Sequence, residues 1–433
     1  MTAHNAYKYL RGIPAKNDRA SSKRLDALLE GMELTEMRRR VFHVLCAGLN
    51  ARHTAAMLNS ILCVAGIGTV LLSFDAPYAP GSPEPALIDG RQPSNEVLVD
   101  AITKIRKCSL ACEEASDPGR YEVLTAYGLE LVRASDARVL VTDVSELPRE
   151  ALKLLPAASI VVLGALPADP TQLLRTVISR GTAETISTQQ SAEVQRLITD
   201  RCADSGCRLT VAARRASPGG PEVTAASFAG FSFFYHAIKL QTSSVFVSSL
   251  ACACASCDAV YALRRSGLEI SEDAVVRGIR AASPVDHGAV VSIKPAVIAA
   301  ALPRELKDAG ADDMRRAALY SVLASDIAAF EAASRHGIRI FWLHGDALPE
   351  EFSAALAEKK VKVLSVLTAD AGEAPAAAAR RIAAEMAVKD EEIEDRDDST
   401  MPHGVRSYVV IGTSEEMSIS LPIVKQGLRR TLF

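Results

Sequence analysis

Residues 43–73, HVLCAGLNARHTAAMLNSILCVAGIGTVLLS, constrain the fold more than any other part of the chain. An apolar run at 41–46 leads into a compact loop at 47–54, which is followed by a helix-period segment at 55–64 and a second apolar run at 69–72. Strand, loop, helix and strand in this order are typical of phosphate-binding units. The stretch therefore predicts an α/β domain with this loop at the end of a buried strand.

The loop AGLNARHT departs from the pattern that binds phosphate. In the motif GxxxxGK[ST], glycines let backbone N–H groups surround the phosphates, the lysine reaches the outer phosphates, and the Ser or Thr hydroxyl holds Mg²⁺. The loop here has one glycine and no lysine. We therefore expect the architecture of a phosphate-binding unit without most of its chemistry.

Length and composition narrow the class of protein. A chain of 433 residues is too long for one ordinary core, so we expect two domains. With 48% apolar and 23% charged residues the chain is typical of globular proteins, and a net charge of −3 with 5% aromatic residues argues against nucleic-acid binding. The first twelve residues lack the apolar core of a signal peptide, which predicts a cytoplasmic protein.

Two long stretches without charge, residues 54–74 and 240–257, have the length of a membrane span. The first is interrupted by Asn59, Gly66 and Gly68, and the second contains several serines. Both are better explained as buried elements of an α/β core, so we expect no contact with a membrane.

The nine cysteines are expected to be reduced thiols. Cys252, Cys254 and Cys257 are spaced so that they point in different directions on a helix, which argues against a metal site. Cys202 and Cys207 are interpreted in the same way, as small buried thiols.

The rest of the chain continues the alternation of strands and helices, which predicts a mostly parallel sheet covered on both faces. We expect a long Pro-rich loop at 76–95, a small antiparallel patch within 208–240, and a linker at 283–295. After the linker the alternation restarts, which predicts a second, smaller α/β domain.

Four segments carry a resemblance to a known family. HV before the loop with TAAMLNSIL after it is similar to HVAGTNGKGSTAAMLxSIL, and DGRQPSNE is similar to NGEPISDE. YEVLTAYGLEL is similar to FExLTAxAFxxF, and GLEISEDAVVRGI is similar to GLxISDEAIxxGL. In this order the segments resemble the Mur ligase superfamily, in its branch of folylpolyglutamate synthases and dihydrofolate synthases.

The resemblance implies both a fold and a reaction. The fold would be a central P-loop-like ATPase domain with a helical lead-in at residues 1–290 and a Rossmann-like ligase domain at 291–433. The reaction would be ATP-dependent amide formation, in which a carboxylate of a folate-like substrate is phosphorylated and an amino group then displaces phosphate. Such chemistry uses ATP and Mg²⁺ held by acidic and hydroxyl side chains.

The loop can be aligned with the family motif in two registers. Aligned without gaps from TAAML, Ala51 takes the place of the lysine and His53 that of the serine. In the register shifted by one, Arg52 replaces the lysine and Thr54 the serine, while side chains stand where glycines are expected. The resemblance thus implies a degenerate nucleotide loop made of Gly48, Asn50, Arg52, His53 and Thr54.

Other motif positions are mostly replaced. Ser73 matches the serine of the family's TSPHL, and Asp143 matches a strand-end glutamate that holds Mg²⁺, so Thr54 and Asp143 are the implied metal ligands. The family's carbamylated lysine falls near Leu174, and its DGAHNP falls on residues 298–303. Its HQxxN falls on Val245, Phe246 and Ser249.

Three functions stay open. In the first the chain is a catalytically impaired or inactive relative, a pseudoenzyme that acts as a scaffold or regulates an active relative or another enzyme. In the second it is a divergent ATP-dependent ligase that uses Arg52, Thr54 and Asp143. In the third it binds a small, for example folate-like, molecule in the interdomain cleft without turnover. His287 and His344 would face that cleft, although for His344 a strand-end turn is the plainer explanation.

Overall fold

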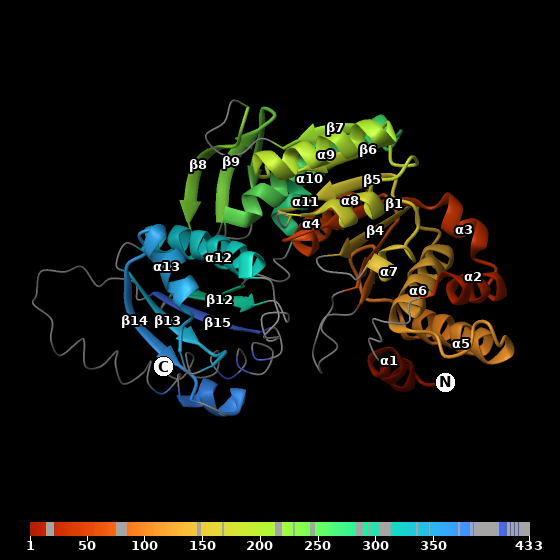
Figure 1. Ribbon diagram of the computed structural model, residues 1–433, viewed down its shortest axis with the longest axis horizontal. Helices are drawn as coiled ribbons and strands as arrows, with labels where there is room; N and C mark the ends of the chain where they lie inside the picture. The colour runs from red at the N-terminus through yellow and green to blue at the C-terminus, as the bar shows by residue number, and fades with distance from the viewer. Residues whose placement is uncertain are drawn as a thin grey trace, which may run out of the picture.

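The computed structural model describes residues 1–13, 21–74, 85–144, 149–166, 169–212, 219–227, 230–242, 247–282, 289–293, 296–302, 313–334, 337–345, 347–370, 373–381, 384, 407–413, 416, 420 and 423. These residues form a seven-stranded, a three-stranded and a five-stranded sheet. In Figure 1 the seven-stranded sheet with its helices and the five-stranded sheet with its helices form two separate bodies.

The seven-stranded sheet has the order β3-β2-β4-β1-β5-β6-β7. Its strands are β1 (Phe42–Ala47), β2 (Thr69–Ser73), β3 (Ala86–Ile88), β4 (Val139–Val144), β5 (Ile160–Leu163), β6 (Glu184–Ser187) and β7 (Arg208–Val211). All pairs are parallel except β2 with β3. Strands β2, β3 and β4 lie on one side of β1, and β5, β6 and β7 lie on the other. The carboxyl end of β1 therefore lies where the strand order reverses. Ligands of open α/β sheets bind at such a switch point.

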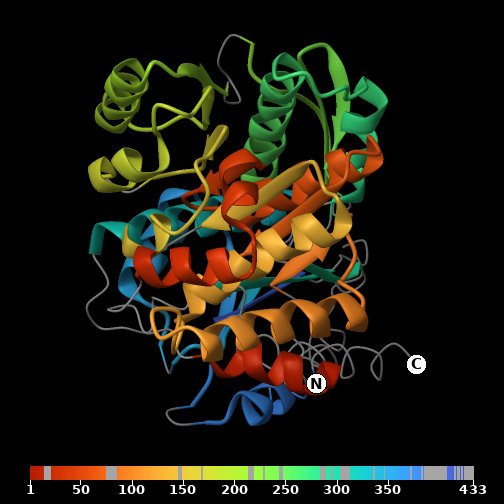
Figure 2. The same ribbon diagram turned by 90° about the vertical axis from the view of Figure 1, so that its right-hand side faces the viewer.

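Helices cover both faces of this sheet, because successive side chains of each strand point to opposite faces. Leu45, Leu72 and Leu140 face one layer, which is formed by α1 (Ala3–Gly12), α2 (Ser22–Gly31), α5 (Asn95–Ala111), α6 (Arg120–Ser135), α7 (Arg149–Leu152), α8 (Thr171–Val177) and α9 (Ala192–Ser205). Figure 2 shows α5 beside α1 in this layer. A further short helix, α3 (Thr35–Arg40), precedes β1.

The opposite layer holds the helix that follows the loop. Val44, Cys46 and Val141 pack there against α4 (Ala51–Val64), α10 (Val247–Arg265) and α11 (Glu272–Ala281). Gly278 of α11 lies so near α4 that an added Cβ would approach the backbone of Ile61 at 2.5 Å. Ser271 caps α11, its Oγ accepting from the N–H of Ala274 at 3.1 Å.

A three-stranded antiparallel sheet follows the large one. It consists of β8 (Glu222–Ser227), β9 (Gly230–Tyr235) and β10 (Ile238–Gln241). Phe231, Phe233 and Tyr235 of β9 are buried in the same core as α10. The small sheet therefore extends the α4–α10 layer of the first domain.

The second domain is a five-stranded sheet of order β11-β12-β15-β13-β14. Its elements are β11 (Ala289–Ile293), β12 (Ala296–Leu302), α12 (Asp313–Ser334), β13 (Ile338–Trp342), α13 (Glu350–Glu358), β14 (Val363–Thr368) and β15 (Ser407–Thr413). Its core includes Phe330, Trp342 and Phe352. Helix α12 also contacts α10, which joins the two domains (Figure 1).

The α/β class and the mostly parallel sheet are confirmed, but several local expectations were wrong. β7 was expected in the antiparallel patch and instead pairs parallel with β6. The expected linker at 283–295 contains β11, because its apolar run AVVSI finds a partner in β12. β3 lies in the expected long loop, paired with β2. Among the described residues no helix combines the length and the hydropathy of a membrane span.

Candidate functional site

The loop after β1 is held by backbone hydrogen bonds to its neighbours. Gly48 has a φ of +88°, and its N–H donates to the carbonyl of Val144 at 3.2 Å. The N–H of Leu49 donates to the carbonyl of Ala165 at 2.9 Å. A Cβ on Gly48 would meet the Ala165 oxygen at 2.8 Å, so glycine is required here. The loop is thus tied to the last residue of β4 and to the segment that follows β5.

The helix α4 begins earlier than the sequence suggested. Asn50 caps it with a φ of +65°, and Ala51 is its first residue. Arg52, His53 and Thr54 therefore belong to the first helical turn and not to the loop, because the αL conformation of Asn50 ends the loop after only three residues. This corrects the expected start at residue 55.

The carbonyl oxygen of Asn50 accepts hydrogen bonds from several donors. It accepts from Thr54 N at 3.1 Å, from Thr54 Oγ1 at 3.3 Å and from the Cys252 thiol at 3.9 Å. The thiol and the Thr54 hydroxyl therefore share one backbone acceptor. By contrast, the buried Oδ1 of Asn50 has no hydrogen-bond partner among the described residues. The hydroxyl expected to hold Mg²⁺ therefore donates its proton to the Asn50 carbonyl.

Arg52 and His53 are buried, with 7% and 2% of their surface exposed. No acidic residue lies in the first turn of α4. The amino end of a helix carries a partial positive charge, and basic side chains beside it add to that field. The start of α4 is consequently a concentration of positive charge at the switch point of the sheet.

A row of polar side chains lies on the strand ends next to this turn. Strand register places Cys46 beside Asp143, and Asp143 beside Ser73. The hydroxyl of Ser73 donates to Asp143 Oδ1 at 2.8 Å, and both residues are buried. Burial and then the Asp143 carboxylate raise the pKa of Cys46, so this thiol stays neutral.

Helices α10 and α12 close the site from the other side. Burial, with a smaller contribution from the carboxylate of Asp326, raises the pKa of Cys252 to about 12. Asp326 is a buried residue of α12, so the second domain brings an acid to the neighbourhood of the loop. Ser249 lies one turn before Cys252, fully buried, and its Oγ has no hydrogen-bond partner among the described residues. Sequence reasoning missed Asp326, because nothing in its local pattern places it near the loop.

The structure brings the predicted site residues together in two linked groups. Asn50 and Thr54 form one, Ser73 and Asp143 form the other, and the thiols of Cys46 and Cys252 lie between them. Among the described residues no group of three or more His, Cys, Asp and Glu side chains could hold a metal ion. The assignment of Thr54 and Asp143 to Mg²⁺ remains a prediction.

Several other sequence positions have plain structural roles or cannot be placed. Leu174 is buried in the core. His344 Nδ1 contacts Glu416 Oε1 at 3.1 Å in the turn after β13. Some positions lie outside the described residues: Val245, Phe246, His287 and the last residue of the 298–303 segment.

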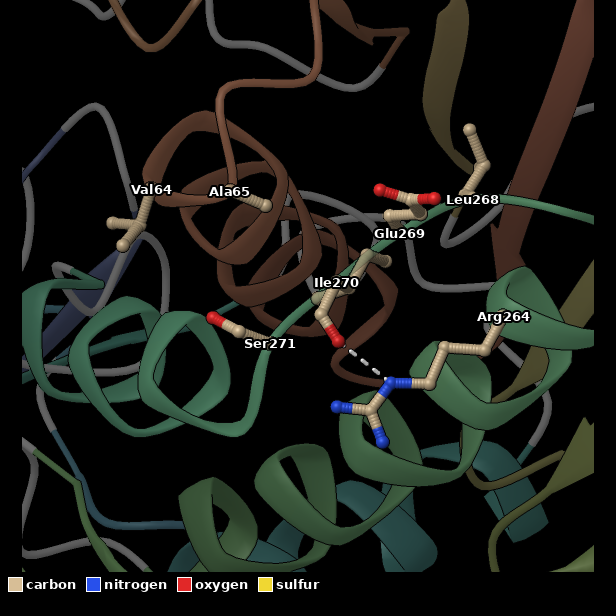
Figure 3. Close-up of a pocket in the computed structure, with 7 residues that line it drawn as sticks. All are labelled: Val64, Ala65, Arg264, Leu268, Glu269, Ile270 and Ser271. Carbon is tan, nitrogen blue, oxygen red and sulfur yellow. Dashed lines mark hydrogen bonds between the residues drawn. The ribbon is translucent and has the colours of Figure 1, made fainter.

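A pocket of about 580 Å³ lies elsewhere in the first domain (Figure 3). It is lined by Val64, Ala65, Arg264, Leu268, Glu269, Ile270 and Ser271. The guanidinium Nε of Arg264 donates to the carbonyl of Ile270 at 2.8 Å across it. Since Val64 ends α4, the pocket lies roughly 20 Å from the loop, and it is not the interdomain cleft.

Comparisons with known proteins find the fold but no close relative. No protein-family model matches the chain, and no curated protein sequence matches it. The apo form of Lactobacillus casei folylpolyglutamate synthase superimposes with a TM-score of 0.70 at 15% identity, over 100% of both chains. The chain has the folylpolyglutamate synthase fold.

Two complexes support the same assignment. A folylpolyglutamate synthase bound to AMPPCP and folate gives a TM-score of 0.70 at 14% identity, over 100% of this chain and 99% of the other. The Mycobacterium tuberculosis folylpolyglutamate synthase bound to ADP gives 0.65 at 16% identity, over 99% and 98%. The resemblance predicted from four short segments therefore extends over the full length of the fold.

Proposed function

We propose that this chain is a folylpolyglutamate synthase-like protein whose ligase activity is impaired or absent, and that it acts as a scaffold or regulatory partner of an active relative or another enzyme. The fold and the position of the loop support the relationship to the synthases. The contacts of the loop support the loss of activity.

The observation that carries the proposal is the hydrogen bonding of the loop amides. In a phosphate-binding loop the backbone N–H groups face the ligand. Here the N–H groups of Gly48 and Leu49 donate to the carbonyls of Val144 and Ala165. A triphosphate would have to compete with these bonds, which supports weak or absent nucleotide binding.

Side chains near the loop also argue against nucleotide binding. In the register that keeps Gly48 and Asn50 in family positions, Ala51 and His53 replace glycines, and a Cβ limits the approach of backbone to phosphate. Thr54 Oγ1 donates its proton to the Asn50 carbonyl, which also accepts from the Cys252 thiol. The carboxylate of Asp326 adds negative charge to the same neighbourhood, which disfavours an anion.

Calorimetry with Mg²⁺-ATP at up to millimolar concentration tests the proposal, together with an assay of ADP release in the presence of a folate and glutamate. We expect no saturable heat and no ADP. A dissociation constant in the micromolar range, or folate-dependent ADP release, would overturn it.

A second candidate is a divergent active ligase, which the positive charge at the start of α4 and the buried Ser73–Asp143 pair favour. Arg52 would then pair with a phosphate, since guanidinium groups bind phosphate with two hydrogen bonds. Arg52→Ala should weaken nucleotide binding at least tenfold. Arg277→Ala, which removes an exposed guanidinium of α11, is the matched control and should change nothing.

A further inference from the structure

Cys202 and Cys207, which the sequence analysis interprets as small buried thiols, lie close together at the end of α9. The helix ends at Gly206, whose φ is +70°, and the N–H of Gly206 donates to Ala203. The N–H of Cys207 donates to the carbonyl of Cys202 at 3.0 Å. These two bonds form a Schellman motif, in which the side chains of these two residues meet.

The backbone bond between Cys207 and Cys202 keeps the two residues, and with them their thiols, in the same turn. The hydroxyl of Thr185 in β6 lies 3.4 Å from Cys207 Sγ. Cys207 is 9% exposed and Cys202 2%, so Cys207 is the more accessible of the pair. Each feature favours Cys207 as the sulfur that reacts first.

The surroundings of Cys207 stabilise its thiolate. The Cys202 thiol, and then the Thr185 hydroxyl and the Arg201 guanidinium, lower the pKa of Cys207 against the effect of burial, while the hydrogen bond to Cys207 raises the pKa of Cys202. Burial instead raises the pKa of Cys63 to about 11. A thiolate with a neighbouring thiol is the arrangement of reactive cysteines with a resolving partner.

We propose that Cys202 and Cys207 form a reversible dithiol–disulfide site that reacts with hydroperoxides. The Cys207 thiolate attacks the terminal oxygen of the peroxide, an S–O bond forms, the O–O bond breaks, and the leaving hydroxide (an alkoxide from an organic hydroperoxide) takes a proton to become water (or an alcohol). The sulfur of Cys202 then attacks Cys207, an S–S bond forms, the S–O bond breaks, and a second water leaves. Two thiols are oxidised and one hydroperoxide is reduced.

The backbone already suits this bond. Disulfides need Cα atoms about 4.4–6.8 Å apart, and the hydrogen bond between Cys207 N and Cys202 O keeps both residues in one turn. The bridge would tie the end of α9 to β7, which begins at the next residue, Arg208. This inference does not depend on the proposed function of the loop.

Peptide mass mapping tests it on the intact wild-type chain. The protein is treated with hydrogen peroxide, the remaining thiols are alkylated, and the chain is digested with trypsin, which releases residues 202–208 as one peptide with both cysteines. We expect this peptide to escape alkylation, to weigh about 2 Da less than the dithiol form, and to regain two alkylation sites after dithiothreitol.

Variants distinguish the role of Cys207, which reacts with the peroxide, from that of Cys202, which then forms the disulfide. In Cys202→Ser the sulfenic acid on Cys207 should persist and react with dimedone, provided that circular dichroism shows the wild-type fold. Cys63→Ser, which removes a partly buried thiol whose pKa is raised by burial, should leave the rate of bridging unchanged. Full alkylation of both cysteines after peroxide treatment of the folded wild-type chain, or oxidation of Cys63 as fast as Cys207, would overturn the proposal.

Discussion

The two ends of β1 bury polar groups in different ways. At the amino end, His43 is fully buried, its Nδ1 lies 3.0 Å from the carbonyl of Pro156, and its Nε2 lies 2.7 Å from Thr142 Oγ1. Because a carbonyl only accepts, Nδ1 carries the proton and Nε2 accepts from the hydroxyl. At the carboxyl end, Asn50 Oδ1 and Ser249 Oγ are buried without hydrogen-bond partners among the described residues.

This difference separates a structural polar group from a candidate site. Buried polar atoms are normally satisfied, and leaving one unsatisfied costs about 1–3 kcal/mol. The amino end meets the rule and has no capacity left to bind anything. At the carboxyl end of β1 the buried Asn50 Oδ1 and Ser249 Oγ break this rule among the described residues, although backbone bonds close the loop. This end therefore keeps polar atoms that the fold does not use. Four substitutions or conditions test this contrast.

The largest effect is expected at the contact that closes the loop. A Cβ on Gly164 would lie inside the contact distance of the Leu49 carbonyl oxygen, and backbone cannot move aside cheaply. Gly164→Ala should lower the free energy of unfolding by about 3 kcal/mol, at the upper end for overpacking. Denaturant unfolding measures it. For the control Gly181→Ala, whose Cβ would meet only Ser179 Oγ at 3.8 Å, we expect a change within about 0.5 kcal/mol. Equal stability of both variants would show that the loop is not held as described.

A comparable effect is expected from acid at the amino end. Burial lowers the pKa of His43 to about 4, below the ordinary 6.5. The unfolded chain therefore binds more protons between these values, and stability is lost as pH falls from 6.5 towards 4, by about 3 kcal/mol. The free energy of unfolding, measured between pH 6.5 and pH 4, should fall with pH in wild type and in His344→Gln. This fall should be absent in His43→Gln. A slope that survives in His43→Gln would assign the acid sensitivity to another group.

A smaller effect is expected for the polar pair at the carboxyl end. Ser73→Ala removes the donor to the buried Asp143 Oδ1 and should cost about 1–2 kcal/mol. A double-mutant cycle with Asp143→Asn isolates the pair, and we expect a coupling of about 1 kcal/mol. Additive effects would mean that the two side chains are neighbours without a stabilising bond.

The smallest effect concerns the loop chemistry itself. Ala51→Gly, Arg52→Lys and His53→Gly together restore the family pattern in the shifted register. We expect the triple variant to bind Mg²⁺-ATP with a dissociation constant of only about 1 mM, or about −4 kcal/mol, because the Gly48 and Leu49 amides stay bonded to protein. Arg52→Lys alone is the control and should give no gain. If the triple variant also gains nothing, the register that pairs Arg52 with the lysine loses its support.

Much of the fold could be predicted, because periodicity reports burial directly. The apolar runs of β1, β2 and β4 and the capped start of α11 are visible in the sequence. β3 and β11 were missed, since short strands next to Pro and Gly become strands only when a neighbour supplies hydrogen bonds. The early start of α4 was missed, because the left-handed conformation of Asn50 depends on the packing of the loop.

The candidate site likewise has parts that the sequence predicts and parts that depend on tertiary packing. The sequence by itself determined that Ser73 and Asp143 lie near the ends of apolar strands and that Arg52, His53 and Thr54 follow the first strand, because local order and strand period govern both. Only the tertiary structure decided that the strands of Ser73 and Asp143 pair side by side, that Ala165 closes the loop, that Cys252 shares the Asn50 carbonyl with Thr54, and that Asp326 approaches from the second domain. These contacts join residues distant in the chain, and no local propensity encodes which distant atoms will meet in a packed core.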